Sequence, residues 1–133
     1  MGLTVVLPTV SLAEMMPEAE QSETTGQQRL INGETTNAIA LLEAAFSAYQ
    51  AANDEAGIRR TADMLWLAYG ALGLEQGLQG NTTAALTSYQ RQLEFADLLQ
   101  DSEKLTQSYL NIGSSHLWLE HWTEARRWLS QGV

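Results

Sequence analysis

One spacing recurs along the chain and restricts what it can fold into. A glycine is followed twelve residues later by an alanine at three places. The pairs are Gly26 with Ala38, Gly73 with Ala85, and Gly113 with Ala125. Two antiparallel helices approach closely only where their side chains are small, with larger neighbours filling the surrounding gaps. Repetition of such pairs in one register predicts repeated helical hairpins.

Two of the three copies agree in more than the glycine and alanine. Tyr69 and Tyr109 lie forty residues apart, each four residues before its glycine, and Leu72 and Ile112 match as well. Proline occurs only at positions 8 and 17, so nothing after residue 17 interrupts a run of helices. Because a single hairpin cannot bury its own apolar face, the copies are expected to stack on one another. The fold class predicted from these features is all-α.

The Tyr-x-x-Ile-Gly sequence that ends at Gly113, with Ala125 twelve residues later, resembles the tetratricopeptide (TPR) repeat. The forty-residue period is similar to that of LGN/rapsyn-type scaffolds, bacterial peptide-sensing regulators and the exported arrays that precede caspase-like domains. The resemblance implies antiparallel helical hairpins stacked as a TPR-like solenoid over residues 17–133, with about three repeats and the last one truncated. Turns are expected near Gly33, Gly80 and Glu120.

Residues 1–16 differ from the rest of the chain. They begin with an apolar run that ends in Ser11-Leu12-Ala13, a small-x-small pattern similar to a signal-peptidase site. The cationic start of a secretory signal is missing, since the first base is Arg29. The segment is therefore either the remnant of a signal peptide or an apolar arm that packs on the solenoid. Export is slightly favoured over a cytoplasmic location, and the mature chain would then begin at Glu14.

Charge and composition restrict the classes of function. The net charge is −9 with no basic stripe, which is unfavourable for binding nucleic acid or anionic membranes. The 44% apolar residues include no run long enough to span a bilayer. The absence of cysteine excludes disulfides and thiolate chemistry. His116 and His121 would lie about 140° apart on one helix, which predicts that they share no metal ion. No catalytic motif is present, so we expect no enzyme activity, cofactor or metal.

The family resemblance also implies a place for a ligand. In TPR arrays the inner surface of the first helix of each hairpin usually lines a peptide groove. Mapped by register, that surface offers ten residues: Gln27, Leu67, Gly70, Ala71, Leu74, Gln107, Leu110, Asn111, Ser114 and Trp118. The candidate groove residues among them are Leu74, Gln107, Asn111, Ser114 and Trp118. Asn111 matches an asparagine that holds the ligand backbone in LGN-like arrays, although Ala71 stands at that place one repeat earlier. Leaving a buried hydrogen-bond partner unpaired costs ~1–3 kcal/mol, so Asn111→Ala is expected to weaken ligand binding. The same substitution is expected to have little effect on stability if Asn111 is solvent-exposed.

The function predicted from these observations is a non-catalytic scaffold that binds a protein or peptide in the inner groove. The alternative is a sensor or regulatory module at the N-terminus of a larger enzyme or transcriptional regulator, with the activity beyond Val133. Since Trp128 and Leu129 would lack the cover of a following repeat, a homo-oligomer through the open C-terminal repeat is a further possibility.

Overall fold

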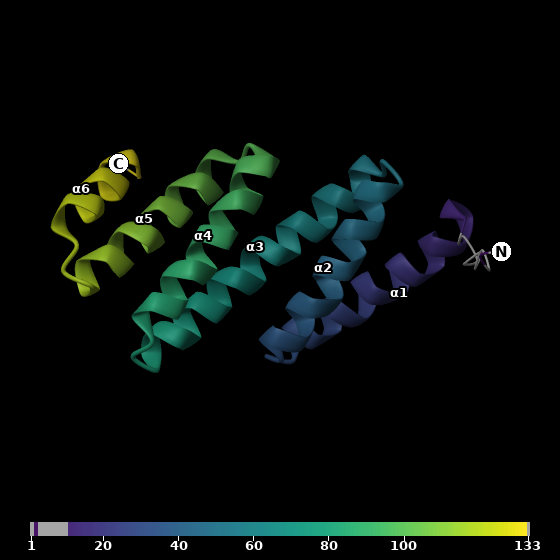
Figure 1. Ribbon diagram of the computed structural model, residues 1–133, viewed down its shortest axis with the longest axis horizontal. Coiled ribbons are helices and arrows are strands. Elements are labelled where there is room, and N and C mark those ends of the chain that lie inside the picture. Colours follow the sequence, from purple (N-terminus) through teal and green to yellow (C-terminus); the bar gives the residue numbers. More distant parts are fainter. Residues whose placement is uncertain (1, 3–10, 133) are drawn as a thin grey trace.

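The computed structural model describes residue 2 and residues 11–132, and these form six α-helices and no strand. The helices are α1 (Leu12–Ile31), α2 (Thr35–Ala51), α3 (Glu55–Leu78), α4 (Thr82–Leu99), α5 (Ser102–Trp118) and α6 (Trp122–Gln131). Figure 1 shows them following one another in chain order along the long axis, with the two ends of the chain at opposite ends of the molecule. Each helix packs chiefly against the helices before and after it in the chain. The predicted all-α solenoid of helical hairpins is confirmed.

Helix α1 begins earlier than expected. Ser11 caps its N-terminus in a capping box, in which the Ser11 hydroxyl accepts from the Glu14 N–H and the Glu14 carboxylate accepts from the Ser11 N–H, both at 3.2 Å. Pro17 lies inside the helix, so the boundary predicted between residues 16 and 17 falls within α1. Residue 1 and residues 3–10 of the predicted arm or signal remnant lie outside the described residues. Cleavage after Ala13 would remove the Ser11 cap.

The three predicted hairpin turns share one backbone arrangement. Each contains one residue with a positive φ, namely Gly33 at 79°, Gly80 at 80° and Glu120 at 59°. The next N–H donates to the carbonyl five residues earlier, at 2.8–2.9 Å. This is the Schellman motif, in which the two residues joined by that bond also bring their side chains together. The joined residues are Arg29 with Glu34, Gln76 with Asn81, and His116 with His121.

The repeated glycines and alanines lie where the two helices of each hairpin meet. Ala38, Ala85 and Ala125 are buried. A Cβ atom on Gly73 would lie 2.5 Å from the Tyr89 ring, closer than real Cβ contacts allow. The equivalent contacts are Gly26 with Leu42, at 2.9 Å, and Gly113 with Leu129, at 2.7 Å. In all three hairpins the glycine therefore leaves room for a large side chain that lies sixteen residues later in the chain. This close contact explains why the spacing of glycine and alanine recurs.

A buried carboxylate joins the first three helices. Glu23 in α1 accepts from the Tyr49 hydroxyl in α2 at 2.5 Å and from Arg60 Nε in α3 at 2.8 Å. Burial raises the pKa of Glu23, but the hydrogen bonds from Arg60 and Tyr49 outweigh that effect and lower it overall. The same arrangement is repeated one helix further on by Glu43, Tyr69 and Arg91. These trios fix the relative positions of successive helices, including α3, which carries part of the candidate site.

Candidate functional site

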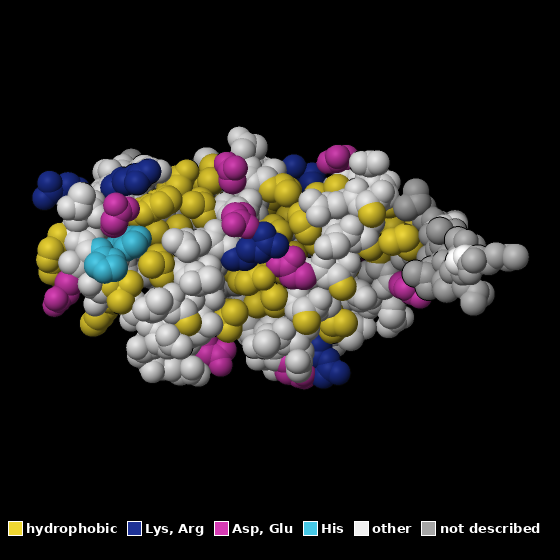
Figure 2. Space-filling view, in the orientation of Figure 1, with side chains coloured by type: hydrophobic (Ala, Val, Ile, Leu, Met, Phe, Trp, Pro, Cys, Tyr) yellow, Lys and Arg dark blue, Asp and Glu magenta, His cyan; other side chains and the backbone are white. Residues whose placement is uncertain are grey.

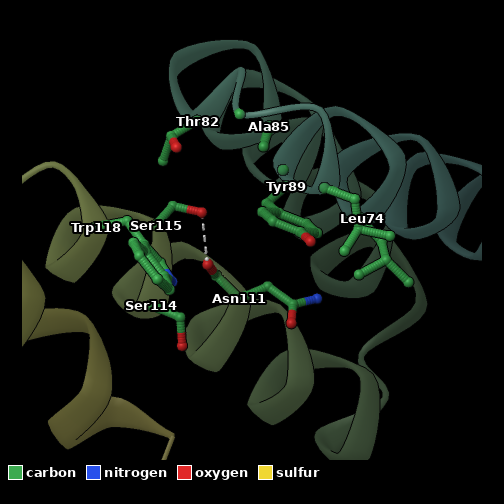
Figure 3. Close-up of a pocket in the computed structure, with 11 residues that line it drawn as sticks. Leu74, Thr82, Ala85, Tyr89, Asn111, Ser114, Ser115 and Trp118 are labelled. Carbon is green, nitrogen blue, oxygen red and sulfur yellow. Dashed lines mark hydrogen bonds between the residues drawn. The ribbon is translucent and has the colours of Figure 1, made fainter.

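Two adjoining cavities lie between α3, α4 and α5, with volumes of about 500 and 420 Å³. Leu74, Tyr89 and Asn111 border both of them, so the cavities form one groove, which we call the α3–α5 groove. Figure 3 shows the larger cavity, with Leu74 and Tyr89 on one side and Asn111 and Trp118 on the other.

The structure places the five candidate groove residues on the α3–α5 groove, whereas Gln27 and Leu110, which the same register assigned to the inner surface, border neither cavity. Leu74 and Asn111 border both cavities, Ser114 and Trp118 border the larger one, and Gln107 borders the smaller one. They are contributed by the first helices of the second and third hairpins, as the register predicts. Whether they bind a peptide is a question of function, to which we return below.

Large apolar side chains stand exposed along the α3–α5 groove. Leu67 and Leu74 are 56% and 58% exposed, while Leu78 and Trp118 are 81% and 82% exposed. Single exposed apolar residues are normal on a protein surface, whereas several such residues along one groove are less common. All the residues that line the two cavities belong to the described part of the chain, and none of them is charged.

A buried amide forms the floor of the groove, and the sequence reasoning did not identify it. Gln92 in α4 is 2% exposed, and its Nε2 donates to the carbonyl of Trp66 at 3.2 Å. Its Oε1 accepts from Asn111 Nδ2 at 3.0 Å, and Asn111 Oδ1 accepts in turn from Gln107 Nε2 at 3.0 Å. Asn111 is thus engaged within the protein, with one N–H and one lone pair left for a ligand.

Gln92 and Tyr89 were missed because only first helices were assigned to the groove, whereas both residues lie on α4, a second helix. A signal for Gln92 was present in the sequence. The buried face of α4 includes Ala85, Ser88, Gln92 and Phe95, so a long amide interrupts a helical face of small and apolar residues. A polar side chain at such a position needs a partner from a neighbouring helix.

The two histidines lie together, so the prediction that their positions on one helix keep them apart was wrong. Their Nδ1 atoms are 3.3 Å from each other. Helix α5 ends at Trp118, and the positive φ of Glu120 turns the chain so that His121 returns to His116. Burial and the neighbouring His121 lower the pKa of His116, and Glu124 partly offsets them. Within the described residues, no group of three or more metal-ligating side chains occurs.

Comparison with known proteins supports the fold. No protein-family model matches the sequence, and no curated protein matches it significantly. Among solved structures, the chain is similar to the crystal structure of the TPR domain of Arabidopsis FLU, with a TM-score of 0.52 and 19% sequence identity. The match covers 89% of this chain and 93% of that one. At this identity the likeness shows the fold, a TPR-like helical repeat, and does not distinguish the LGN-like from the bacterial subtype.

Helices of this length could in principle include a membrane span. None of the helices formed by residues 11–132 is both long and apolar enough to cross a bilayer.

Proposed function

We propose that this chain is a non-catalytic scaffold that binds an apolar, uncharged segment of another protein in the α3–α5 groove. The observation that carries the proposal is the exposure of Leu67, Leu74, Leu78 and Trp118 along a groove whose lining has no charge. Covering apolar surface contributes about 25 cal/mol per Å², so these side chains would gain most from a partner that is itself apolar.

The chemistry of the lining supports both the absence of catalysis and the kind of partner. Tyr89 is the one titratable side chain among the lining residues, and burial raises its pKa, so it has no charge at neutral pH. General acid–base catalysis works best with a group whose pKa lies near the working pH, and a Ser or Thr nucleophile needs an adjacent base, which this lining does not supply. The groove also offers no cation for a carboxylate, which makes an acidic tail an unfavourable ligand.

The polar floor would complement such a partner. Asn111 keeps one N–H and one lone pair beyond its bonds to Gln92 and Gln107, and these can pair with a backbone amide of the ligand. Since Asn111 is held by two internal hydrogen bonds, its amide is oriented before the ligand arrives, and little side-chain entropy is lost on binding.

A display library of random peptides, selected on the purified chain, supplies a defined probe. We expect the selected peptides to be apolar and uncharged, and to bind with an affinity that changes little between low and high salt. Trp118→Ala should weaken binding by about fivefold or more, because a truncated aromatic anchor in an interface typically costs over 1 kcal/mol. Titration calorimetry measures both effects.

Ile31→Ala is the matched control, because Ile31 is 72% exposed in α1 and lines neither cavity. Its affinity for the selected peptides should equal that of the wild type. Selected peptides rich in Asp and Glu, or equal affinities for Trp118→Ala and the wild type, would contradict the proposal.

A further inference from the structure

The turn between α5 and α6 brings two imidazoles together at the surface. His116 lies in the last turn of α5 and is 8% exposed, whereas His121 is the exposed N-cap residue of α6. Figure 2 shows the histidine side chains as one patch at the α6 end of the molecule, with an acidic side chain beside it. The proposed scaffold function does not use this pair, which borders neither cavity of the α3–α5 groove.

The separation of the two Nδ1 atoms matches that of two ligands on one metal ion. Zinc binds imidazole nitrogen at ~2.0–2.1 Å, so two ligands at a tetrahedral angle lie ~3.3–3.4 Å apart. A square-planar ion with bonds of the same length would bring adjacent nitrogens to ~2.8–3.0 Å. The observed distance is 3.3 Å. We propose that His116 and His121 form a two-histidine zinc site that joins the end of α5 to the start of α6, with water in the remaining positions.

The surroundings of the pair leave the His121 ring free and supply one nearby carboxylate. His121 caps α6 without a side-chain hydrogen bond to the helix, so its ring is not engaged in capping. The partial negative charge of the C-terminus of α5 is opposed by the partial positive charge of the N-terminus of α6, where His121 lies, so the two helix ends give little net preference. The carboxylate of Glu124, in the first turn of α6, acts electrostatically on His116. Zinc binds the neutral imidazole, so the ion competes with protons for both rings.

The same distance would suit a hydrogen bond between two neutral imidazoles, one ring donating Nδ1–H to the other. The two arrangements differ in what they require. A hydrogen bond needs a proton on one Nδ1, whereas zinc needs both Nδ1 atoms deprotonated. Zinc should therefore displace that proton, and the Nδ1 resonances of both rings should move together.

The experiment uses the full chain without an added histidine tag. The sequence contains two histidines and no cysteine, so any bond between zinc and imidazole must involve this pair. We expect calorimetric titration with zinc chloride to show one site per chain, and zinc to raise the melting temperature. Nitrogen-15 spectra of the rings should show both Nδ1 resonances shifting on addition of zinc.

His121→Ala tests the assignment of zinc to the two histidines. This variant should fold, because His121 is exposed. Zinc affinity should fall at least tenfold, and the zinc-dependent rise in melting temperature should disappear. Glu120→Gln, on the same turn, is the matched control and should bind like the wild type. Absence of zinc binding would leave a simple imidazole hydrogen bond and overturn the proposal. Equal binding by His121→Ala would assign the ion to carboxylates and overturn it as well.

Discussion

The side-chain amide of Asn111 on α5 donates a hydrogen bond of 3.0 Å to the side-chain oxygen of Gln92 on α4, at the bottom of the α3–α5 groove. Gln92 is buried, and its other polar atom is used by the carbonyl of Trp66. Asn111 therefore contributes to the interface between two hairpins in addition to any contact with a ligand. Little effect of its loss on stability was expected only if Asn111 were solvent-exposed, and Asn111 is half-buried.

Asn111→Ala should destabilise the chain by ~1–3 kcal/mol, because it leaves the buried Oε1 of Gln92 without a donor. Gln107→Ala should change the free energy of unfolding by less than about 0.5 kcal/mol, because Gln107 is exposed and bonds only to Asn111. Urea unfolding of both variants measures the difference.

A double-mutant cycle isolates the pair. If Gln92 is replaced by leucine first, no buried oxygen remains for Asn111 to satisfy, so Asn111→Ala should then cost much less than in the wild type. Equal costs in the two backgrounds would show that the hydrogen bond does not couple α4 to α5.

The glycines of α3 should respond in opposite directions to substitution. Gly73→Leu should destabilise by ~1–3 kcal/mol or more, since even a Cβ atom would lie 2.5 Å from the Tyr89 ring. Gly77 has only the Cβ of Ala85 near it, at 4.0 Å, so Gly77→Ala should stabilise by ~0.5–1 kcal/mol through helix propensity. Thermal unfolding followed by circular dichroism checks both. A lower melting temperature for Gly77→Ala would mean that α3 needs a close approach there too.

The left-handed residues of the turns provide a second opposed pair. Gly80→Ala should cost ~1–2 kcal/mol, because φ is 80° and a Cβ atom clashes in that conformation. Glu120 already carries that strain at 59°, so Glu120→Gly should stabilise by up to about 1 kcal/mol after the added chain entropy of glycine. If both variants melt below the wild type, relief of strain at Glu120 is not the dominant effect.

The Glu23 carboxylate should make stability depend on acid pH. Its folded pKa lies below the ordinary value of 4.5, so its contribution is present above that value and is lost as the pH falls through the folded pKa. Glu23→Gln should cost about 1–2 kcal/mol at pH 7, a moderate figure because the Arg60 side chain is 50% exposed and can return to water.

Urea unfolding from pH 7 to pH 3 follows this effect. The difference between wild type and Glu23→Gln should shrink as the pH falls below about 4.5. Glu20→Gln, at an exposed position of the same helix, is the charge-matched control and should stay within about 0.5 kcal/mol of the wild type. A difference that stays constant over this range would exclude the carboxylate charge as its source.

The hairpins and their turns could be predicted because each depends on residues close together in the chain. Gly73 and Ala85 lie in the two helices of one hairpin, and Tyr89, on which Gly73 packs, lies in the same hairpin. Five predicted groove residues follow from the same register, because the first helices of successive hairpins lie on one side of the array. Their function remains a proposal.

Two features of the sites could not be predicted in this way. The bond from Asn111 to Gln92 joins two hairpins, and the hairpin register gives no relation between them. The histidine pair was treated as lying on one helix although a turn was expected near Glu120, because an expected turn does not by itself give the direction in which the chain returns. A Schellman turn at Glu120 joins residues five apart, so the spacing of the histidines is a usable signal once the turn is known.

By itself, the sequence determined that this protein is an array of helical hairpins, because helical periodicity and the close approach at glycine and alanine act within each unit. Only the tertiary structure decided that Gln92 supports Asn111 beneath the groove and that His116 meets His121. The physical reason is one of range. Hydrogen bonds and metal ligands require atoms to approach within about 3 Å, and that approach is set by how helices cross and turn in space, which a one-dimensional spacing does not specify.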